Sequence, residues 1–100
     1  MLEQTILEKI NQLEQQILVH SIMYYRLGAS IWDDFMYDRK AKELQSLIEA
    51  NPDEFKASIL YNDFKLFSWE SGYDLPLLDS HYTAVAIWLV EYHKQQGGTV

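Results

Sequence analysis

The sequence predicts an all-α protein, a long antiparallel helical hairpin covered by one or two C-terminal helices. Two stretches, residues 6–27 and residues 37–48, carry apolar residues at the alternating three- and four-residue spacing of one helical face. A helix-ending signal follows each stretch, Gly28 after the first and Asn51-Pro52 after the second. The spacing and the stop signals together indicate two helices joined by a turn.

The first predicted helix spans residues 2–27, and its apolar residues form a seam of the kind that packs against a partner helix. The seam consists of Ile6, Ile10, Leu13, Ile17, His20, Tyr24 and Leu27, with Leu7 and Leu18 beside it. Good helix formers, among them Glu8, Lys9 and Glu14, lie between the seam residues and are expected on a solvated face. Gly28 is expected to end the helix.

The second predicted helix follows a connector of about four residues, which makes the two helices antiparallel neighbours. Ser30 is the expected N-cap, with Asp33 three residues later in an approximate capping box. Asp33 and Asp34 also suit the positive end of the helix dipole. The apolar face repeats at a 4-3-4 spacing as Tyr37, Ala41, Leu44 and Ile48, with Leu47 alongside. Asn51-Pro52 punctuates the chain here, with Asn51 as the cap of the next helix.

The segment 52–69 is less regular, and we expect a third helix there. Two short extended pieces would also be compatible with part of it. Its helical stripe consists of Phe55, Ile59, Leu60, Phe64, Phe67 and Trp69. The residues from Ser71-Gly72 to Leu75-Pro76 indicate a loop of about ten residues.

A last helix is predicted from His81 to about Gln95, capped by Asp79 or Ser80. Gly97-Gly98 ends it. Its apolar face consists of Val85, Trp88, Leu89 and Tyr92. Trp69, Trp88 and the phenylalanines are expected in the core.

Composition limits the function. The chain has 100 residues, of which 48% are hydrophobic, so we expect one domain, with the hairpin in residues 3–55 and its cover in residues 56–100. The absence of cysteine excludes disulfides and zinc–thiolate sites. No apolar run is long enough to span a membrane, and we expect a cytoplasmic protein. The net charge of -7 argues against direct binding of nucleic acid.

Polar and aromatic chemistry is concentrated around the turn of the hairpin. Tyr24 and Tyr25 close the first helix, and Asp34, Tyr37 and Asp38 lie in the first turns of the second. The two acids are four residues apart and therefore share a helical face. Acids beside aromatic rings suit a planar cation and the hydroxyl groups of a ribose, as in the nicotinamide half of NAD.

A purely structural interpretation of the same residues is also open. The tyrosines would then pack the hairpin, and Asp34 and Asp38 would pair with Arg26, Arg39 or Lys42. The three histidines have no spacing typical of metal ligands, and no nucleophile–base pair is evident. We therefore expect neither a metal site nor catalytic residues.

The motif around the turn resembles the N-terminal helical domain of the NAD-dependent bacterial DNA ligases over about residues 3 to 55. The matching residues are His20 four positions before the aromatic pair, Tyr24-Tyr25, Asp34, Tyr37-Asp38-Arg39, the stretch Glu43-Leu44-Gln45-Ser46-Leu47, and Asn51-Pro52. In that family the domain closes over the adenylation domain and binds the nicotinamide mononucleotide half of NAD. The resemblance implies that role for Tyr24, Tyr25, Asp34, Tyr37 and Asp38.

The sequence departs from the family pattern in several places. It has no Lys-x-Asp-Gly nucleophile motif, so we expect a non-enzymatic protein with no required cofactor, and NAD or nicotinamide mononucleotide as a possible ligand. The proline-containing loop of the family is replaced by residues 28–32, and Ile22 replaces an aromatic residue. Residues 56–100 look unrelated to the ligases.

Two functions follow as hypotheses. The first is a protein-interaction or regulatory module that acts on a ligase or another replication or repair protein, or that forms a homo-oligomer through the first helix. The -7 charge favours a basic partner surface. The alternative is a small-molecule binding module for nicotinamide mononucleotide or NAD, in which Tyr24 and Tyr25 stack, Asp34 and Asp38 bind ribose hydroxyls, and Tyr37 orients.

Overall fold

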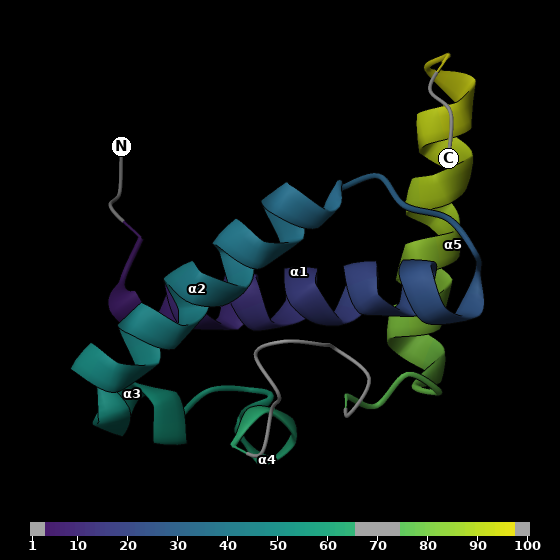
Figure 1. The fold of residues 1–100 in the computed structure, drawn as a ribbon. Helices are drawn as coiled ribbons and strands as arrows, with labels where there is room; N and C mark the ends of the chain where they lie inside the picture. The colour runs from purple at the N-terminus through teal and green to yellow at the C-terminus, as the bar shows by residue number, and fades with distance from the viewer. Residues whose placement is uncertain (1–3, 66–74, 98–100) are drawn as a thin grey trace.

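The computed structural model describes residues 4–65 and 75–97, and every element in these residues is a helix, which confirms the all-α class (Figure 1). The helices are α1 (Ile6–Arg26), α2 (Asp34–Ala50), α3 (Pro52–Lys56), α4 (Tyr61–Phe64) and α5 (Ser80–Gln95). Helix α1 is the centre of the fold, because α2, α3 and α5 all pack against it. No helix in the described part of the chain combines the length and the hydropathy that crossing a bilayer requires.

Helix α1 begins in a complete capping box, in which Thr5 accepts from the Glu8 backbone and Glu8 accepts from the Thr5 backbone. The middle of the predicted seam is confirmed, since Ile10, Leu13 and Ile17 have no exposed surface. Two of the predicted seam residues are wrong, since Ile6 and Tyr24 are exposed, whereas Leu27 at the end of the seam is partly buried against the core. Leu18, predicted beside the seam, is buried as well. The buried face is wider than predicted, because it also includes Glu14, Val19, Ser21, Ile22 and Met23.

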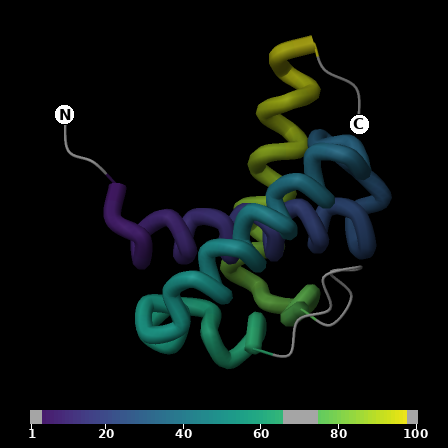
Figure 2. Tube along the Cα trace, turned by 60° about the vertical axis from the view of Figure 1, so that its left-hand side comes forward, coloured from purple at the N-terminus to yellow at the C-terminus, as the bar shows by residue number. Residues whose placement is uncertain are grey.

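The connector between α1 and α2 is longer than predicted. Gly28 ends α1 in the left-handed conformation, with φ of +61°, and the Met23 carbonyl accepts from the N–H groups of Leu27 and Ala29. The N-cap of α2 is Asp33 rather than Ser30, because the Asp33 carboxylate accepts from Met36 N at 2.7 Å while the Ser30 hydroxyl donates to the Trp32 carbonyl. Helix α2 then returns obliquely across α1 (Figures 1 and 2).

The segment 52–65 contains two short helices, α3 and α4, instead of one long helix. The helix is interrupted at Ser58–Leu60, because side chains of α1 form hydrogen bonds with the polar groups of this segment. Asn11 Oδ1 accepts from Ile59 N at 2.9 Å, and the Glu14 carboxylate accepts from Ser58 Oγ at 2.9 Å and Leu60 N at 3.4 Å. The end of the predicted helix, with Phe67 and Trp69, and the predicted loop up to residue 74 lie outside the described residues.

Helix α5 crosses α1 steeply and is capped by Asp79, whose carboxylate accepts from Tyr82 N at 2.9 Å (Figure 1). Its buried residues are Ala86 and Val90, with Val85 and Leu89 half-buried. The predicted apolar face was therefore only half right. Trp88 and Tyr92 are exposed, because the helix presents to α1 a face rotated away from these two residues. Phe35 is exposed as well, contrary to the core position predicted for the phenylalanines.

A candidate nucleotide site at the turn of the hairpin

The two adjacent tyrosines form an open aromatic corner at the end of α1. The rings of Tyr24 and Tyr25 meet edge to face, with centroids 5.0 Å apart and planes at 89°. Tyr24 is 58% exposed and Tyr25 is 40% exposed, so both keep ring surface for a ligand. The last turn of α1 thus presents two fixed rings instead of burying them in the hairpin.

Tyr37 reaches back from α2 to the same end of α1. Its hydroxyl lies 2.9 Å from the hydroxyl of Ser21, which is buried in α1, and the two groups share a hydrogen bond. Burial raises the pKa of Tyr37, the Ser21 hydrogen bond lowers it, and the nearby Tyr25 phenol raises it. Tyr37 therefore lies near Tyr25 of the other helix, and its hydroxyl is already engaged by Ser21.

The two acids lie at the exposed start of α2. Asp34 is the first residue of the helix, and Asp38 follows one turn later, so both carboxylates reach solvent. Asp38 Oδ2 pairs with Lys42 Nζ at 3.0 Å, which is one of the pairings in the structural interpretation. Both members of this pair are exposed, and such a pair contributes only a few tenths of a kcal/mol. The pairing therefore leaves Asp38 available to a ligand at little cost.

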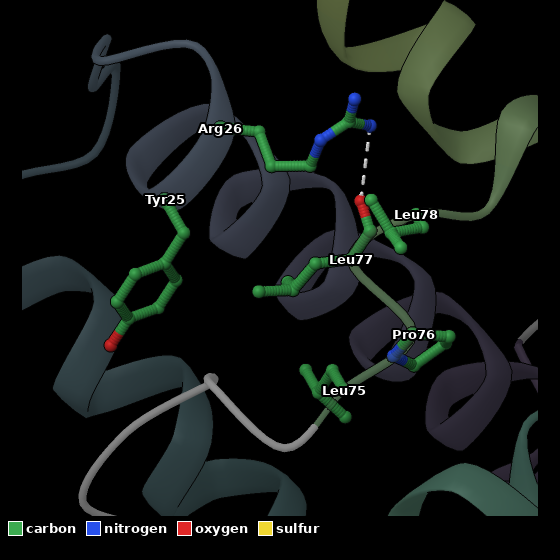
Figure 3. Close-up of a pocket in the computed structure, with 6 residues that line it drawn as sticks. All are labelled: Tyr25, Arg26, Leu75, Pro76, Leu77 and Leu78. Carbon is green, nitrogen blue, oxygen red and sulfur yellow. Dashed lines mark hydrogen bonds between the residues drawn. The ribbon is translucent and has the colours of Figure 1, made fainter.

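Arg26 does not neutralise these acids. Its Nη1 atom donates to the Leu77 carbonyl at 3.2 Å and to Thr83 Oγ1 at 2.9 Å. The guanidinium group therefore ties the end of α1 to the start of α5. In Figure 3 it points toward α5 and away from the Tyr25 ring.

A stacked pair that was not predicted fixes the connector ahead of the acids. The rings of His20 and Trp32 are parallel within 6°, with centroids 3.7 Å apart. Burial lowers the pKa of His20 to about 4, so the imidazole is neutral at pH 7. The stack holds the residue directly before the Asp33 cap against α1, and so determines where α2 begins. A sequence signal existed, since Trp32 is the only large aromatic residue in the connector.

A pocket of about 500 Å³ lies between the end of α1 and the segment that precedes α5 (Figure 3). Its walls are mostly hydrocarbon, and it is lined by Tyr25, Arg26, Leu75, Pro76, Leu77 and Leu78. Neither acid of the candidate site lines it, so this pocket is separate from the acidic surface. Within residues 4–65 and 75–97, no three His, Asp or Glu side chains gather in a way that could hold a metal ion.

A comparison with known protein families covers the hairpin and its turn. The family model described as "DNA ligase-like, N-terminal NAD+-binding domain" matches residues 3–58, more than half of the chain. The chain belongs to this family. The resemblance predicted for residues 3 to 55 is thereby confirmed.

The ligase-like chain is also similar to a DNA ligase of Flavobacterium psychrophilum, with 27% identity over 84 residues. The match covers 69% of this chain and 13% of the ligase, so the chain corresponds to a small part of that protein. No solved structure matches the chain. All five candidate residues, and also Ser21 and Trp32, lie inside the family segment of this ligase-like domain, whereas Leu75–Leu78 and α5 lie outside it.

Proposed function

We propose that this ligase-like domain binds the nicotinamide mononucleotide half of NAD at the turn of its hairpin. The observation that carries the proposal is the Ser21–Tyr37 hydrogen bond, which joins the start of α2 to the end of α1 that carries the two exposed tyrosines. Asp34 and Asp38 are exposed on the same turns of α2 as Tyr37. The family description, an NAD+-binding domain, supports the same ligand class.

The residues present fit this ligand. An oxidised nicotinamide ring is flat and cationic, and exposed tyrosine faces attract such rings by stacking and by cation–π interaction. Asp34 and Asp38 offer carboxylate oxygens that can accept hydrogen bonds from ribose hydroxyls. Because Ser21 already binds the Tyr37 hydroxyl, Tyr37 contributes its ring rather than a free donor.

We further propose that the domain is itself non-catalytic and works in the cytoplasm. The sequence contains no Lys-x-Asp-Gly motif, so no lysine of that motif is present to accept an adenylyl group. In this proposal the nucleotide is a ligand and not a required cofactor. The chemistry would then fall to a nucleotidyl-transferring partner.

A second candidate function is a protein-interaction or regulatory module for a DNA ligase or another replication or repair protein. One observation favours it: Phe35 is 70% exposed at the start of α2, flanked by Asp34 and Asp38. An apolar anchor surrounded by charges is typical of a docking surface. The charge of -7 matches a basic surface on the partner.

A titration tests the nucleotide proposal. The whole chain is titrated with nicotinamide mononucleotide and with NAD while amide chemical shifts or heats are recorded. The matched variants are Asp38→Ala and Glu49→Ala, since both remove one exposed acid from α2 and Glu49 lies at its far end. We expect saturable binding that Asp38→Ala weakens by roughly tenfold or more and Glu49→Ala leaves unchanged.

The titration can also overturn the proposal. No saturable shift at millimolar nucleotide would remove the nucleotide function, and equal affinity in the two variants would remove Asp38 from the site. The protein-interaction candidate would then be tested with a purified DNA ligase. Binding that Phe35→Ser abolishes, and that rising salt weakens, would support it.

A further inference from the structure

Helix α5 carries an exposed apolar face that no described part of the chain covers. Ile87 is 47% exposed, Trp88 is 61% exposed and Tyr92 is 49% exposed. The rings of Trp88 and Tyr92 stack on each other, with centroids 5.3 Å apart and planes at 16°. Trp88 and Tyr92 therefore form one exposed aromatic surface, and such surfaces usually mark an interaction site. Ile87 is exposed on the same side of the helix, with the exposed Glu91 between it and Trp88. We name it the α5 face.

The position of α5 makes this surface accessible. The C-terminal half of the helix extends beyond α1 and α2 in both ribbon and tube views (Figures 1 and 2). The exposed fractions of Trp88 and Tyr92 show that this surface can be reached by another molecule. By contrast, Ile10, Leu13 and Ile17 in the middle of α1 are fully buried, and the exposed apolar residues of α1 are confined to its two ends. The self-association through α1 stays a prediction.

The charges of the molecule identify the partner. Of the 15 acidic residues of the chain, only Glu91 lies in α5, and Lys94 lies on the next turn. A strongly basic partner would be drawn to the acids elsewhere, and the α5 face has little charge with which to hold it. An apolar, nearly neutral helix face is complementary to another of the same kind.

We infer that the α5 face pairs with the α5 face of a second copy of this chain, in a two-fold symmetric, antiparallel arrangement. In such an arrangement Trp88 of one copy lies against Tyr92 of the other, and the reverse. Two aromatic pairs then form the centre of the interface, where such residues contribute most of the binding energy. The bulk of the negative charge stays away from the contact. This inference does not depend on the nucleotide site.

Sedimentation velocity of the whole chain, from about 1 µM to about 1 mM, tests the inference. We expect a reversible monomer–dimer equilibrium. Trp88→Lys should weaken dimerisation by roughly tenfold or more, because it places a charge at the centre of the interface. Leu78→Lys is the matched control: Leu78 is even more exposed but precedes the helix, so dimerisation should not change.

Salt separates the proposed partner from others. Raising NaCl from about 0.05 to about 0.5 M should strengthen the dimer, since it screens repulsion between two chains of charge -7. A monomer at every concentration would overturn the inference. A dimer that Trp88→Lys does not weaken, while its circular dichroism stays helical, would overturn it as well. Nucleotide titration of the Trp88→Lys variant should match that of the unmodified chain, which keeps this outcome separate from the nucleotide proposal.

Discussion

Ser58 Oγ donates a hydrogen bond to Glu14 Oε2 across 2.9 Å, joining the break between α3 and α4 to the middle of α1. The Glu14 carboxyl has no exposed surface, and its other oxygen accepts from Leu60 N. Burial raises the pKa of Glu14 to about 7, the hydrogen bonds from Ser58 and Leu60 lower it, and Asp63 raises it. The acid is therefore a proton-binding group inside the fold.

The first prediction concerns this proton. The unfolded pKa of Glu14 is 4.5 and the folded value is about 7, so the folded state holds more protons between these values. The stabilisation due to Glu14 is complete below pH 4.5 and is lost as pH rises through about 7. Measured against Glu14→Gln by urea unfolding, the wild-type advantage should fall by up to roughly 3 kcal/mol across this window. A pH-independent difference would contradict the prediction.

The second prediction concerns His20, which titrates in the opposite sense. Its folded pKa of about 4 lies below its unfolded value of 6.5, so the unfolded state binds more protons in between. The stability that neutral His20 contributes therefore appears as pH rises from 4 to 6.5. The unfolding free energy of His20→Phe should lose this rise while keeping a ring against Trp32. A rise of the same size in His20→Phe would contradict the prediction.

These two contributions offset each other in the unmodified chain. Between about pH 4.5 and 6.5, stability from Glu14 decreases with pH while stability from His20 increases. We therefore expect the unmodified chain to show a flatter pH profile in this range than either single variant. A steep profile in the unmodified chain would mean that other groups dominate.

The third prediction concerns Ser21 and Tyr37. Ser21→Ala leaves the half-buried Tyr37 hydroxyl without its partner and should reduce the unfolding free energy by about 1–2 kcal/mol. Tyr37→Phe removes the other hydroxyl, and the double variant should be less destabilised than the sum of the two single variants. A double-mutant cycle by urea unfolding measures this coupling, about 1 kcal/mol. If Tyr37 acts through its ring, Tyr37→Phe should also retain nucleotide binding.

The fourth prediction concerns the end of α1. A Cβ added to Gly28 would meet no atom within 4 Å, so Gly28→Ala creates no clash. The cost comes only from the φ of +61°, and we expect a loss of about 1 kcal/mol in unfolding free energy. Gly97 has a similar φ of +81° near the end of the described chain, and Gly97→Ala should cost less because that end carries fewer contacts. Equal losses at both positions would contradict this explanation.

Periodicity predicted the two hairpin helices because each has one apolar face. It failed for α5, where residues 84–90 are apolar all round the helix, so that spacing cannot distinguish the inner face from the outer. Only the crossing with α1 makes Ala86 inner and Trp88 outer. Glu14 was placed on the solvated face for a related reason, since its burial depends on Ser58, which lies 44 residues away.

The sequence predicted the part of the candidate site that follows from a motif of fixed spacing. The spacing of Tyr24, Tyr25, Asp34, Tyr37 and Asp38 indicated the family, and the family match confirms that resemblance. The five ligand roles stay predictions. The Ser21–Tyr37 hydrogen bond could not be foreseen, because it joins two different helices. The role of Trp32 had a signal in the connector, but its partner His20 depends on the fold.

The hydrogen bonds from Arg26 to Leu77 and Thr83 have a practical consequence for the design of truncated forms of this protein. A fragment ending at residue 58, where the family match ends, would lose both acceptors. It would also strip Ala86 and Val90 from α1 and leave a row of leucine and isoleucine side chains facing water. Such a fragment should be insoluble, whereas a fragment that extends to residue 97 keeps the α5 residues that cover α1. The smallest stable fragment of this protein is therefore determined by the residues that cover α1, and not by the length of the family match.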